Sequence, residues 1–517
     1  MSDNGNNSAP FVHKFQTKNN NYIYCLNTNR IFEVNNVVYQ IIDDYNVITN
    51  DNIMNKFKNI YKKQEIQNAI NAIEEIRTKT GAFGSRIAEN FKIAMSEEEY
   101  EYEINNKIGT ITLNVTENCN LRCSYCSYDK NNSFNRSHSN KMMTWDTAKA
   151  AIDFLKPRHK ETKTKGIGWY GGEPFLNFDI MKRSLDYFIE TINIENNDIF
   201  TVNLTTNATV LNKEKIKWLC DNNVHVLISL DGPQLMHDRY RKYKNGKGSY
   251  NEVIRNLESI KNTDEKYFNR HISINTVMSP PFRFMQLYEY FKNSKLFSKN
   301  VIRMNFINSL ESREFLNQFS EIDKQINSDY CFLFNVFKEN IIKEKYDGNV
   351  NSEKSLLKNM FMRGFYCIAN RSISPPIQSI PLLPCRIGVE KLFVNVDGKL
   401  FPCSNMNEKI TEYCIGDVIN GFYRDNGNTI AYQKMKEITE LVNILCADCW
   451  ANRLCDKCCF TSMLPTKSDT LEYLQKYCYG KRQYIHEMLQ EYFIIEEHNP
   501  DALQSLKTNL NGRRFEL

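Results

Sequence analysis

Short β-rich runs alternate with amphipathic helical runs from Lys107 onward, and this alternation constrains the fold more than any other feature of the chain. Helical runs between strands are the pattern of β/α units and a parallel sheet. The expected strands are Thr110–Thr116, Gly166–Tyr170, Thr201–Thr205, His225–Leu230, His271–Val277 and Ile302–Ile307. Such a series predicts an α/β fold in which the strands form a partial (β/α)6 barrel. Enzymes of this architecture carry their chemistry at the C-terminal ends of the strands.

The segments outside the barrel predict further domains. Residues 1–100 are expected to form an N-terminal module, with strands at Tyr22–Leu26 and Arg30–Val34 followed by helices. The barrel is assigned to residues 107–330 and a bridging helical segment to 331–366. A loop-rich, cysteine-rich domain follows at 367–480, and a C-terminal helix and tail at 481–517.

Composition excludes two classes of partner. The net charge is only +5, from 66 basic and 61 acidic residues, so the chain lacks the cationic excess of a nucleic-acid binder. No apolar run is long enough to span a bilayer, and the first ten residues are polar. We therefore expect a cytoplasmic protein with neither a nucleic acid nor a membrane as its partner.

The chain has 16 cysteines, which a reducing cytosol does not allow to persist as disulfides, so clustered cysteines indicate metal binding. Cys119, Cys123 and Cys126 directly follow the first barrel strand, at a spacing that lets three thiolates close on one face of a cube-shaped cluster. Iron–sulfur clusters normally take four cysteines, so a trio leaves one iron open to a small molecule. Structural zinc is the alternative, although zinc sites typically use CxxC pairs.

This trio, with Tyr125 before its last cysteine, resembles the CxxxCxxC signature of radical S-adenosyl-L-methionine (SAM) enzymes, which have a TIM-like partial barrel. The resemblance implies a [4Fe–4S] cluster, bound SAM and reductive cleavage of SAM to a 5′-deoxyadenosyl radical. Further family motifs recur in order along the barrel, and the residues that match them are Gly171, Gly172, Glu173, Pro174, Thr206, Asn207, Ser229, Arg241 and Val277.

The resemblance assigns roles to these residues. Backbone and carboxylate in the Gly171–Pro174 segment would bind the methionine ammonium of SAM, because a carboxylate and an ammonium form a charge-assisted hydrogen bond. Thr206 and Asn207 would lie near the nucleoside. Ser229 and Arg241 would hold the ribose and the carboxylate, and Val277 would pack on the adenine.

One competing motif lies in the same region. Gly166-Ile-Gly168-Trp-Tyr-Gly171 fits the GxGxxG dinucleotide fingerprint, which has to follow a strand and open a helix. Here the glycines lie within or before the expected strand. The sequence therefore argues against a nicotinamide cofactor.

A second group of cysteines resembles the SPASM extension of radical SAM enzymes, which carries two auxiliary [4Fe–4S] clusters. By resemblance, Cys385, Cys403 and Cys459 hold the first cluster. The second cluster takes Cys446, Cys449, Cys455 and Cys478. The fourth ligand of the first cluster is either Cys367 or absent, which would leave an iron open to a substrate thiolate.

The N-terminal module resembles the small winged-helix elements that recognise leader peptides in maturases of ribosomally made peptides. Such elements add the leader as an extra strand, so that backbone pairing provides affinity. The alternative is a domain that only covers one end of the barrel.

Together these resemblances predict a SPASM-type maturase that oxidatively cross-links a ribosomally made precursor peptide, with thioether formation, as in sactipeptides and ranthipeptides, favoured. A reductase, flavodoxin or ferredoxin would supply the electron. Carbon–carbon cross-linking and sulfatase maturation are alternatives. Sulfatase maturases have a basic aspartate after the second SPASM cysteine, whereas Ser404 follows Cys403 here. A non-catalytic iron–sulfur electron carrier is the remaining hypothesis.

Overall fold

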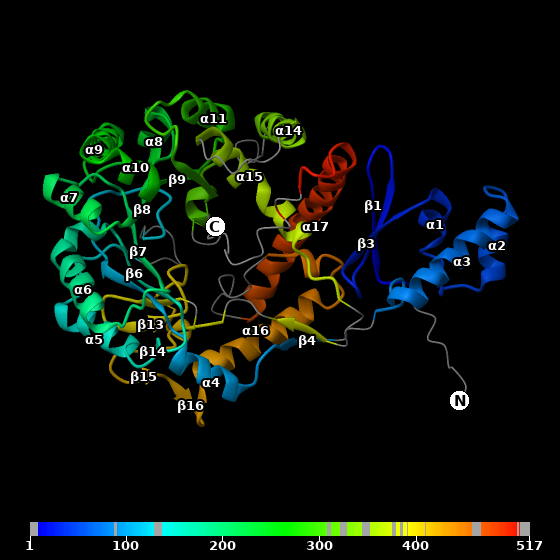
Figure 1. Cartoon of the computed structure of the whole chain (residues 1–517), viewed down its shortest axis with the longest axis horizontal. Coiled ribbons are helices and arrows are strands. Elements are labelled where there is room, and N and C mark those ends of the chain that lie inside the picture. The colour runs from blue at the N-terminus through cyan, green and yellow to red at the C-terminus, as the bar shows by residue number, and fades with distance from the viewer. Residues whose placement is uncertain are drawn as a thin grey trace.

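The structure is a computed structural model of the whole chain (Figure 1). It describes residues 9–86, 90–128, 137–307, 312–320, 328–343, 352–374, 379–382, 386–389, 391–408, 410–456, 467–503 and 506.

Six parallel strands in sequential order form the centre of the molecule, which confirms the predicted α/β fold with a parallel sheet. They are β5 (Thr110–Thr116), β6 (Thr164–Gly171), β7 (Ile199–Thr206), β8 (His225–Ser229), β9 (Ile272–Met278) and β10 (Val301–Phe306). Helices surround the curved sheet on its outer side (Figure 1). They are α5 (Trp145–Leu155), α6 (Phe178–Thr191), α7 (Lys213–Asp221), α8 (Gln234–Tyr240), α9 (Tyr250–Thr263), α10 (Glu265–His271) and α11 (Phe284–Asn293).

Strand β9 shows how the sequence creates two faces of this sheet. Its residues alternate between buried and half-buried from Ile272 to Met278, because successive side chains of a strand point to opposite faces. Ile272 and Ile274 pack into the main hydrophobic core. Asn275 and Val277 lie on the other face, which lines the inside of the barrel.

The cysteine-rich segment extends the same sheet beyond β5. Strand β12 (Leu392–Val394) pairs in parallel with β5, aligning Leu392 with Ile111. Three antiparallel strands continue from it: β13 (Lys399–Phe401), β14 (Gly416–Asp417) and β15 (Gly421–Phe422). The segment that carries Cys403 is thereby attached directly to the strand that precedes the Cys119 loop.

The opposite edge of the barrel, at β10, is covered by helix α15 (Ser352–Ala369). The backbone N–H of Ile302 donates to Ser355 Oγ at 2.9 Å, and that of Met304 donates to Asn359 Oδ1 at 3.1 Å. Unpaired backbone groups on an edge strand are a template for aggregation, and these helix side chains satisfy them.

The remaining elements of the C-terminal half lie around this edge and beneath the barrel. Their bounds are α12 (Arg313–Leu316), α14 (Ser328–Lys343), β16 (Arg424–Asp425), β17 (Asn428–Thr429), α16 (Ile430–Cys446) and α17 (Lys467–His498). Helix α4 (Glu97–Asn106) leads into the barrel, and β4 (Asn90–Ile93) pairs with β11 (Ser379–Leu382). Helix α17 runs without a break across residue 480, where a boundary was expected.

The N-terminal module has three antiparallel strands rather than the two predicted: β1 (Val12–Gln16), β2 (Asn21–Cys25) and β3 (Arg30–Val34). Three helices follow, α1 (Asn36–Ile41), α2 (Asn50–Phe57) and α3 (Lys63–Thr80). Strand β2 is buried on both faces. Ile23 and Cys25 pack within the module, whereas Tyr22 and Tyr24 belong to the main core.

Polar contacts join the module to the C-terminal half. The His13 ring stacks on Trp450 with centroids 3.4 Å apart, and its Nε2 lies 2.9 Å from His486 Nδ1 on α17. Glu497 accepts hydrogen bonds from Thr17 Oγ1 at 2.7 Å and from the Tyr22 hydroxyl at 2.8 Å. Figure 1 shows α17 running between the barrel and this module.

The buried contact of His13 predicts that the folded protein loses stability as the pH falls. Burial, assisted by His486, lowers the pKa of His13 from 6.5 to about 3. The unfolded chain therefore binds a proton that the folded protein excludes. Stability is complete above about pH 6.5 and falls as the pH drops towards 3, by about 1.4 kcal/mol per pH unit.

His13→Phe keeps a ring on Trp450 and removes this proton. Between about pH 7 and pH 5, we expect wild type to lose about 2 kcal/mol more unfolding free energy than the variant in urea titrations. Equal losses would contradict the account.

Alanine substitutions at two glycines, Gly480 on α17 and Gly364 on α15, test how these two helices pack. A Cβ on Gly480, inside α17, would meet no heavy atom within 4 Å, whereas a Cβ on Gly364 would lie 2.6 Å from Met488 Cγ. Gly480→Ala should raise the unfolding free energy by about 0.5–1 kcal/mol, because glycine weakens helix interiors. Gly364→Ala should lower it by about 1–3 kcal/mol through overpacking. Chemical denaturation of both variants checks the opposite signs, and a stabilised Gly364→Ala would refute this packing.

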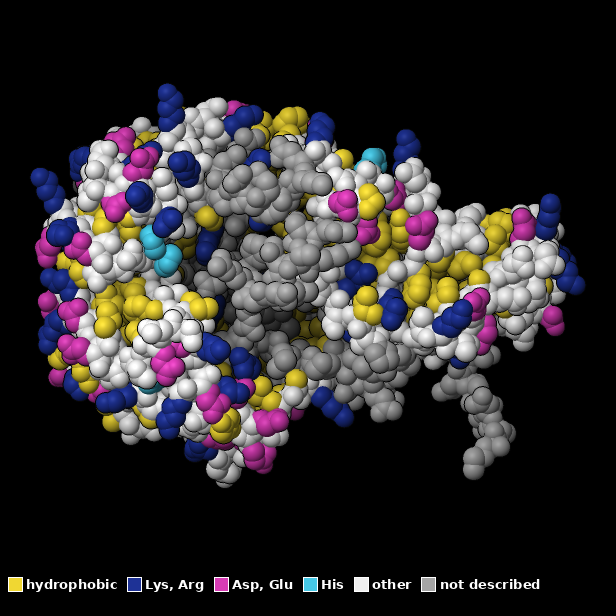
Figure 2. Space-filling model, viewed as in Figure 1, with side chains coloured by type: hydrophobic (Ala, Val, Ile, Leu, Met, Phe, Trp, Pro, Cys, Tyr) yellow, Lys and Arg dark blue, Asp and Glu magenta, His cyan; other side chains and the backbone are white. Residues whose placement is uncertain are grey.

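No helix in the described part of the chain has the length and apolar character needed to cross a membrane. On the face shown in Figure 2, Lys and Arg side chains are interspersed with Asp and Glu around the rim of the barrel.

Candidate active site at the C-terminal ends of the barrel strands

The predicted site residues come from loops that leave the C-terminal ends of β5 to β9. Cys119 is buried, and Cys123 and Cys126 are half-buried on the loop after β5. The loop folds around its own sulfurs, because the backbone N–H groups of Leu121 and Tyr128 each lie 3.4 Å from a cysteine Sγ. The structure therefore presents the three thiols from one short, ordered turn.

A second segment holds this loop in place. The backbone N–H of Arg122 donates to Lys242 O at 2.7 Å, and that of Ser124 donates to Tyr240 O at 3.2 Å. These bonds bring Arg241 next to the trio. Burial raises the pKa of Cys123 to about 12, and the Arg241 guanidinium opposes this rise. A cation beside a thiol is the environment that a metal-bound thiolate needs.

In the described part of the chain, no three His, Cys, Asp or Glu side chains converge on a single metal ion. Three cysteine thiols on one loop are a donor set that fits an iron–sulfur cluster with one iron left open.

The end of β6 touches the start of the cysteine loop, and glycine makes this approach possible. The backbone N–H of Gly172 donates to Thr116 O at 2.8 Å, and that of Glu173 donates to Asn118 O at 2.9 Å. A Cβ on Gly172 would overlap the backbone oxygen of Asn118. Gly171 has φ +138°, a conformation that favours glycine.

Glu173 is completely buried at this junction. Its carboxylate accepts hydrogen bonds from Thr206 Oγ1 at 2.7 Å and from the Asn207 backbone N–H at 2.8 Å. Burial raises the pKa of Glu173, and these donors act in the opposite direction. In this structure the carboxylate ties the end of β6 to the end of β7. Pro174 begins the short 3₁₀ helix that follows.

Asn207 links the end of β7 to the loop that carries the three cysteines. Its Nδ2 lies 3.7 Å from Cys119 Sγ and 3.0 Å from Asn120 Oδ1. Thr206, Asn207, Glu173 and Cys119 are therefore brought together in this structure.

Asp231 organises the end of β8, and sequence reasoning gave it no role although it lies inside the matched motif. Its Oδ2 accepts from Arg241 Nε at 2.9 Å and from the Tyr125 hydroxyl, and its Oδ1 accepts from the Val277 backbone N–H at 3.0 Å. The Asp231 and Arg241 side chains are 4% and 8% exposed. Burial alone would lower the pKa of Arg241, but Asp231 raises it well above its usual range. Ser229, also buried, completes this strand end.

A buried histidine supports Asp231 from behind. His237 Nδ1 accepts from the Asp231 backbone N–H at 3.3 Å, and its Nε2 lies 3.0 Å from Ser249 Oγ. Burial lowers the pKa of His237 to about 4. The neutral ring is therefore the form that these two contacts need.

Glu408 is a second residue that sequence reasoning missed. Asn114 Nδ2, on β5, donates to both of its carboxylate oxygens at 3.2 and 3.3 Å, and also lies 3.3 Å from the Tyr128 hydroxyl. This contact places a carboxylate from the cysteine-rich segment at the mouth of the barrel. Only its position soon after Cys403 could have suggested it.

The second group of cysteines is described in part. Cys385 and Cys459 lie outside the described residues. Cys446 ends α16, Cys478 lies on α17, and the Cys449 N–H donates to Cys446 O at 3.0 Å. Cys455 follows a short 3₁₀ helix. The auxiliary-cluster assignments remain predictions.

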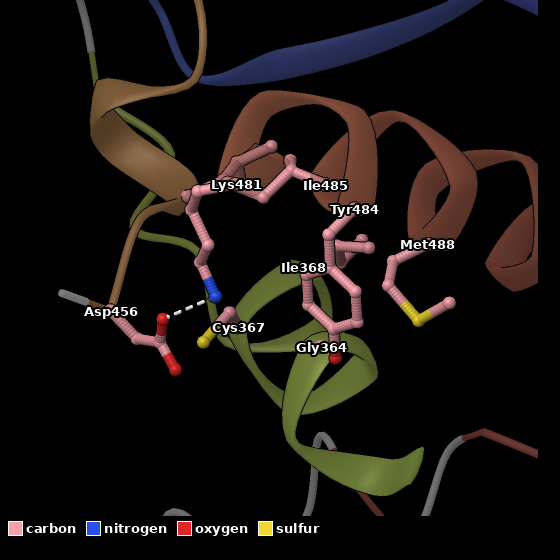
Figure 3. Close-up of a pocket in the computed structure, with 9 residues that line it drawn as sticks. Gly364, Cys367, Ile368, Asp456, Lys481, Tyr484, Ile485 and Met488 are labelled. Atoms are coloured by element: carbon pink, nitrogen blue, oxygen red, sulfur yellow. Dashed lines mark ion pairs between the residues drawn. The ribbon is translucent and has the colours of Figure 1, made fainter. Parts of the chain in front are cut away.

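Cys367 lies in a small pocket between α15 and α17, together with Asp456 and Lys481 (Figure 3). Lys481 Nζ is 2.6 Å from Asp456 Oδ1. Asp456 follows Cys455 directly in the sequence. Burial raises the pKa of Cys367, and Asp456 and Cys455 raise it further. These neighbours associate Cys367 with the second predicted ligand set, whereas the sequence reasoning offered it to the first.

The matches to known proteins agree with this site. Residues 113–281 match the model of the Radical SAM superfamily, so the chain contains a radical SAM domain. Members of this superfamily are enzymes, and they bind a [4Fe–4S] cluster and SAM.

Two relatives in sequence have names that state an activity. A cysteine-type anaerobic sulfatase-maturating enzyme of Clostridium novyi is 31% identical over 30% of this chain and 40% of its own length. The radical SAM cyclopropyl synthase TigE of Paramaledivibacter caminithermalis is 27% identical over 37% and 39%. An uncharacterised protein of Methanocaldococcus jannaschii is 34% identical over 33% and 52%. The chain thus spans about half or less of the curated relatives it matches.

Solved structures show the same fold. Native anSMEcpe with bound AdoMet superposes with a TM-score of 0.52 at 18% identity, over 77% of this chain and 99% of the other. Native anSMEcpe with bound AdoMet and the Cp18Cys peptide gives a TM-score of 0.51 over the same shares.

Proposed function

We propose that this chain is a radical SAM peptide maturase, which cleaves SAM reductively and oxidatively cross-links a ribosomally made precursor peptide. The observation that carries the proposal is the meeting of three groups at neighbouring strand ends: the Cys119 loop, the Glu173 junction and the Asp231–Arg241 pair. A carrier of electrons has no need for the second and third groups. The non-catalytic hypothesis therefore explains less of the site.

Cys119, Cys123 and Cys126 would hold the [4Fe–4S] cluster, which supplies the electron that cleaves SAM. The rest of the site contributes position and shielding. Gly171 and Gly172 let backbone groups approach the methionine end of SAM. Glu173 would position this segment, because both of its carboxylate oxygens already accept hydrogen bonds, from Thr206 and Asn207.

Ser229, Arg241 and Val277 would line the ribose and adenine end of SAM. Asp231 holds the Arg241 side chain and the Val277 backbone in place through hydrogen bonds. The Tyr125 ring lies 5.4 Å from the Arg241 guanidinium. This arrangement is held by buried hydrogen bonds, so it needs little reorganisation when SAM binds.

We further propose that the cysteine-rich segment is a SPASM domain. Cys385, Cys403 and Cys459 would hold one auxiliary cluster, and Cys446, Cys449, Cys455 and Cys478 the other. Forming a thioether from a thiol and a C–H group removes two electrons and two protons in all. One hydrogen atom leaves with the deoxyadenosyl group, and an auxiliary cluster would take the second electron. Glu408 would receive the remaining proton.

The N-terminal module would bind the leader of the precursor. Among the described residues, β3 pairs only with β2, so its other edge offers backbone groups to an added strand. A flavodoxin, ferredoxin or reductase would be the electron donor, and the cytoplasm the compartment.

Sulfatase maturation is the second candidate function, favoured by the relatives of that activity. Ser404 stands where those enzymes place a basic aspartate, but Glu408 brings a carboxylate to the barrel mouth by another route. Carbon–carbon cross-linking of a peptide is a further alternative within the same class.

The test uses the reconstituted, reduced full chain with SAM and two peptides. One is a short cysteine-containing peptide chosen by a search of the neighbouring genes, and the other is a sulfatase-derived peptide. Thioether formation predicts a loss of two hydrogens and of one alkylatable thiol in the first peptide, read by mass spectrometry. Formylglycine in the second peptide, with the first unchanged, would establish the sulfatase alternative instead.

A further inference from the structure

Arg303, on the inner face of the barrel, has no hydrogen-bond or ion-pair partner among the described residues. Arg303 lies in the middle of β10, directly beside Asn275 of β9 in the parallel register, and Asn275 is in turn beside Ser229 of β8. Ile302 and Met304, on the other face of β10, are buried in the core. Asn305 Nδ2 donates to Asn275 Oδ1 at 2.7 Å, which shows that alternate residues of β10 share the inner face with Asn275.

Arg303 is half-buried, and its guanidinium forms no hydrogen bond or ion pair with any residue in the described ranges. Its neighbours on the inner face, Asn275 and Asn305, are neutral amides. By contrast, Arg241, the other arginine of the site, is neutralised by Asp231 at 2.9 Å. A guanidinium that is partly withdrawn from water, with no anion beside it, is a binding group for an incoming carboxylate.

The position of Arg303 favours a carboxylate of the peptide over that of SAM. In the sheet order β10-β9-β8-β7-β6-β5, Arg303 lies on the strand next to β9 at the end of the parallel series. The residues assigned to SAM occupy the ends of β6 to β9. The exposed Asn305 continues the inner face of β10 beyond Arg303, towards the mouth of the barrel.

We propose that Arg303 is a specificity-determining residue that binds an acidic side chain of the peptide substrate next to the position that reacts. The proposal rests on the proposed function and names one feature of its substrate. Asn275 and Asn305 flank the guanidinium with amides that suit peptide backbone groups. A precursor with Asp or Glu near its modified residue is therefore the substrate that this barrel selects.

The probe is a pooled library of synthetic peptides, each with one Asp or Glu in an otherwise randomised neutral sequence, mixed with matched Asn and Gln peptides. Reconstituted full-length protein with SAM captures peptides, which mass spectrometry counts. Wild type and the control Arg270→Gln, an exposed arginine on α10, should enrich acidic over amide peptides about tenfold, the effect of a strong charge-assisted contact.

Arg303→Gln should bring this ratio to about one, and Arg303→Glu should enrich Lys and Arg peptides from a basic library. Arg303→Lys, which keeps the charge, should retain part of the preference and guards against a folding defect in the other variants. An unchanged acidic preference in Arg303→Gln overturns the proposal. So does a weaker SAM affinity with an unchanged preference, because the carboxylate bound would then be that of SAM.

The failure of the proposed function has a separate readout. If wild-type protein forms no 5′-deoxyadenosine from SAM, the maturase proposal fails, whereas the capture ratios still report on Arg303. If 5′-deoxyadenosine forms equally in wild type and Arg303→Gln and the capture ratios match, only the Arg303 proposal fails.

Discussion

Asp231→Ala is expected to lower the free energy of unfolding by about 3–5 kcal/mol, because it leaves the buried Arg241 guanidinium without its counter-charge. The same change removes the acceptor of the Tyr125 hydroxyl and of the Val277 N–H. These groups border the cysteine loop and the adenine position. The folded fraction of the variant should therefore also lose SAM cleavage, to below about a hundredth of wild type, since misplaced groups at a reacting centre cost that much.

A matched variant separates stability from function. Lys165 and Asp198 form another shielded ion pair, at 2.6 Å, but at the N-terminal end of β6. Asp198→Ala should also destabilise the protein, yet its folded fraction should cleave SAM at the wild-type rate. Denaturant titrations and 5′-deoxyadenosine assays on both variants make the comparison. If Asp231→Ala keeps wild-type activity per folded molecule, Asp231 is only a stability residue.

Gly172→Ala is expected to have the second large effect. Its Cβ would overlap the backbone oxygen of Asn118, the residue before Cys119, so either β6 or the cysteine loop has to move. Such overpacking costs about 1–3 kcal/mol of stability. Because the movement falls on the cysteine loop, iron incorporation and SAM cleavage should fall at least about tenfold, which corresponds to about 1.4 kcal/mol in the barrier.

Gly166→Ala is the control on the same strand. Its Cβ would crowd the Thr201 backbone and hydroxyl, far from the cysteine loop. It should cost similar stability but leave iron content and SAM cleavage per folded molecule unchanged. Similar catalytic losses in both variants would show that β6 transmits strain along its whole length, contrary to the account.

The sequence predicted most of the barrel because each strand and helix there carries its own periodicity. Thr110–Thr116 and the start of β8 at His225 fall where the pattern put them. On β9, the alternation of residue types along the strand determines which side chains face the core and which face the barrel interior. Strand-end motifs were predictable for the same reason, since parallel strands bring their ends to one edge.

Contacts between distant segments were not predictable. Strand β1 was missed because Val12-His-Lys-Phe-Gln is polar on one side and gains its burial from α17 and Trp450. The pairing of β12 with β5, and the Asn114–Glu408 contact that accompanies it, join residues almost 300 positions apart. No pattern within a short stretch of sequence identifies the distant partner in such a contact. The central role of Asp231 was hidden for a related reason, because its partners Tyr125, Arg241 and Val277 come from three separate segments.

The measurement that tests the central claim most directly is the formation of 5′-deoxyadenosine by the anaerobically reconstituted full chain with SAM and dithionite. Wild type should form it, and Cys123→Ala should form none above the protein-free background, while Cys220→Ala, at a partly buried cysteine on α7, should match wild type. An absence of product from wild type, or equal product from Cys123→Ala, would contradict the assignment of Cys119, Cys123 and Cys126 as the cluster that cleaves SAM.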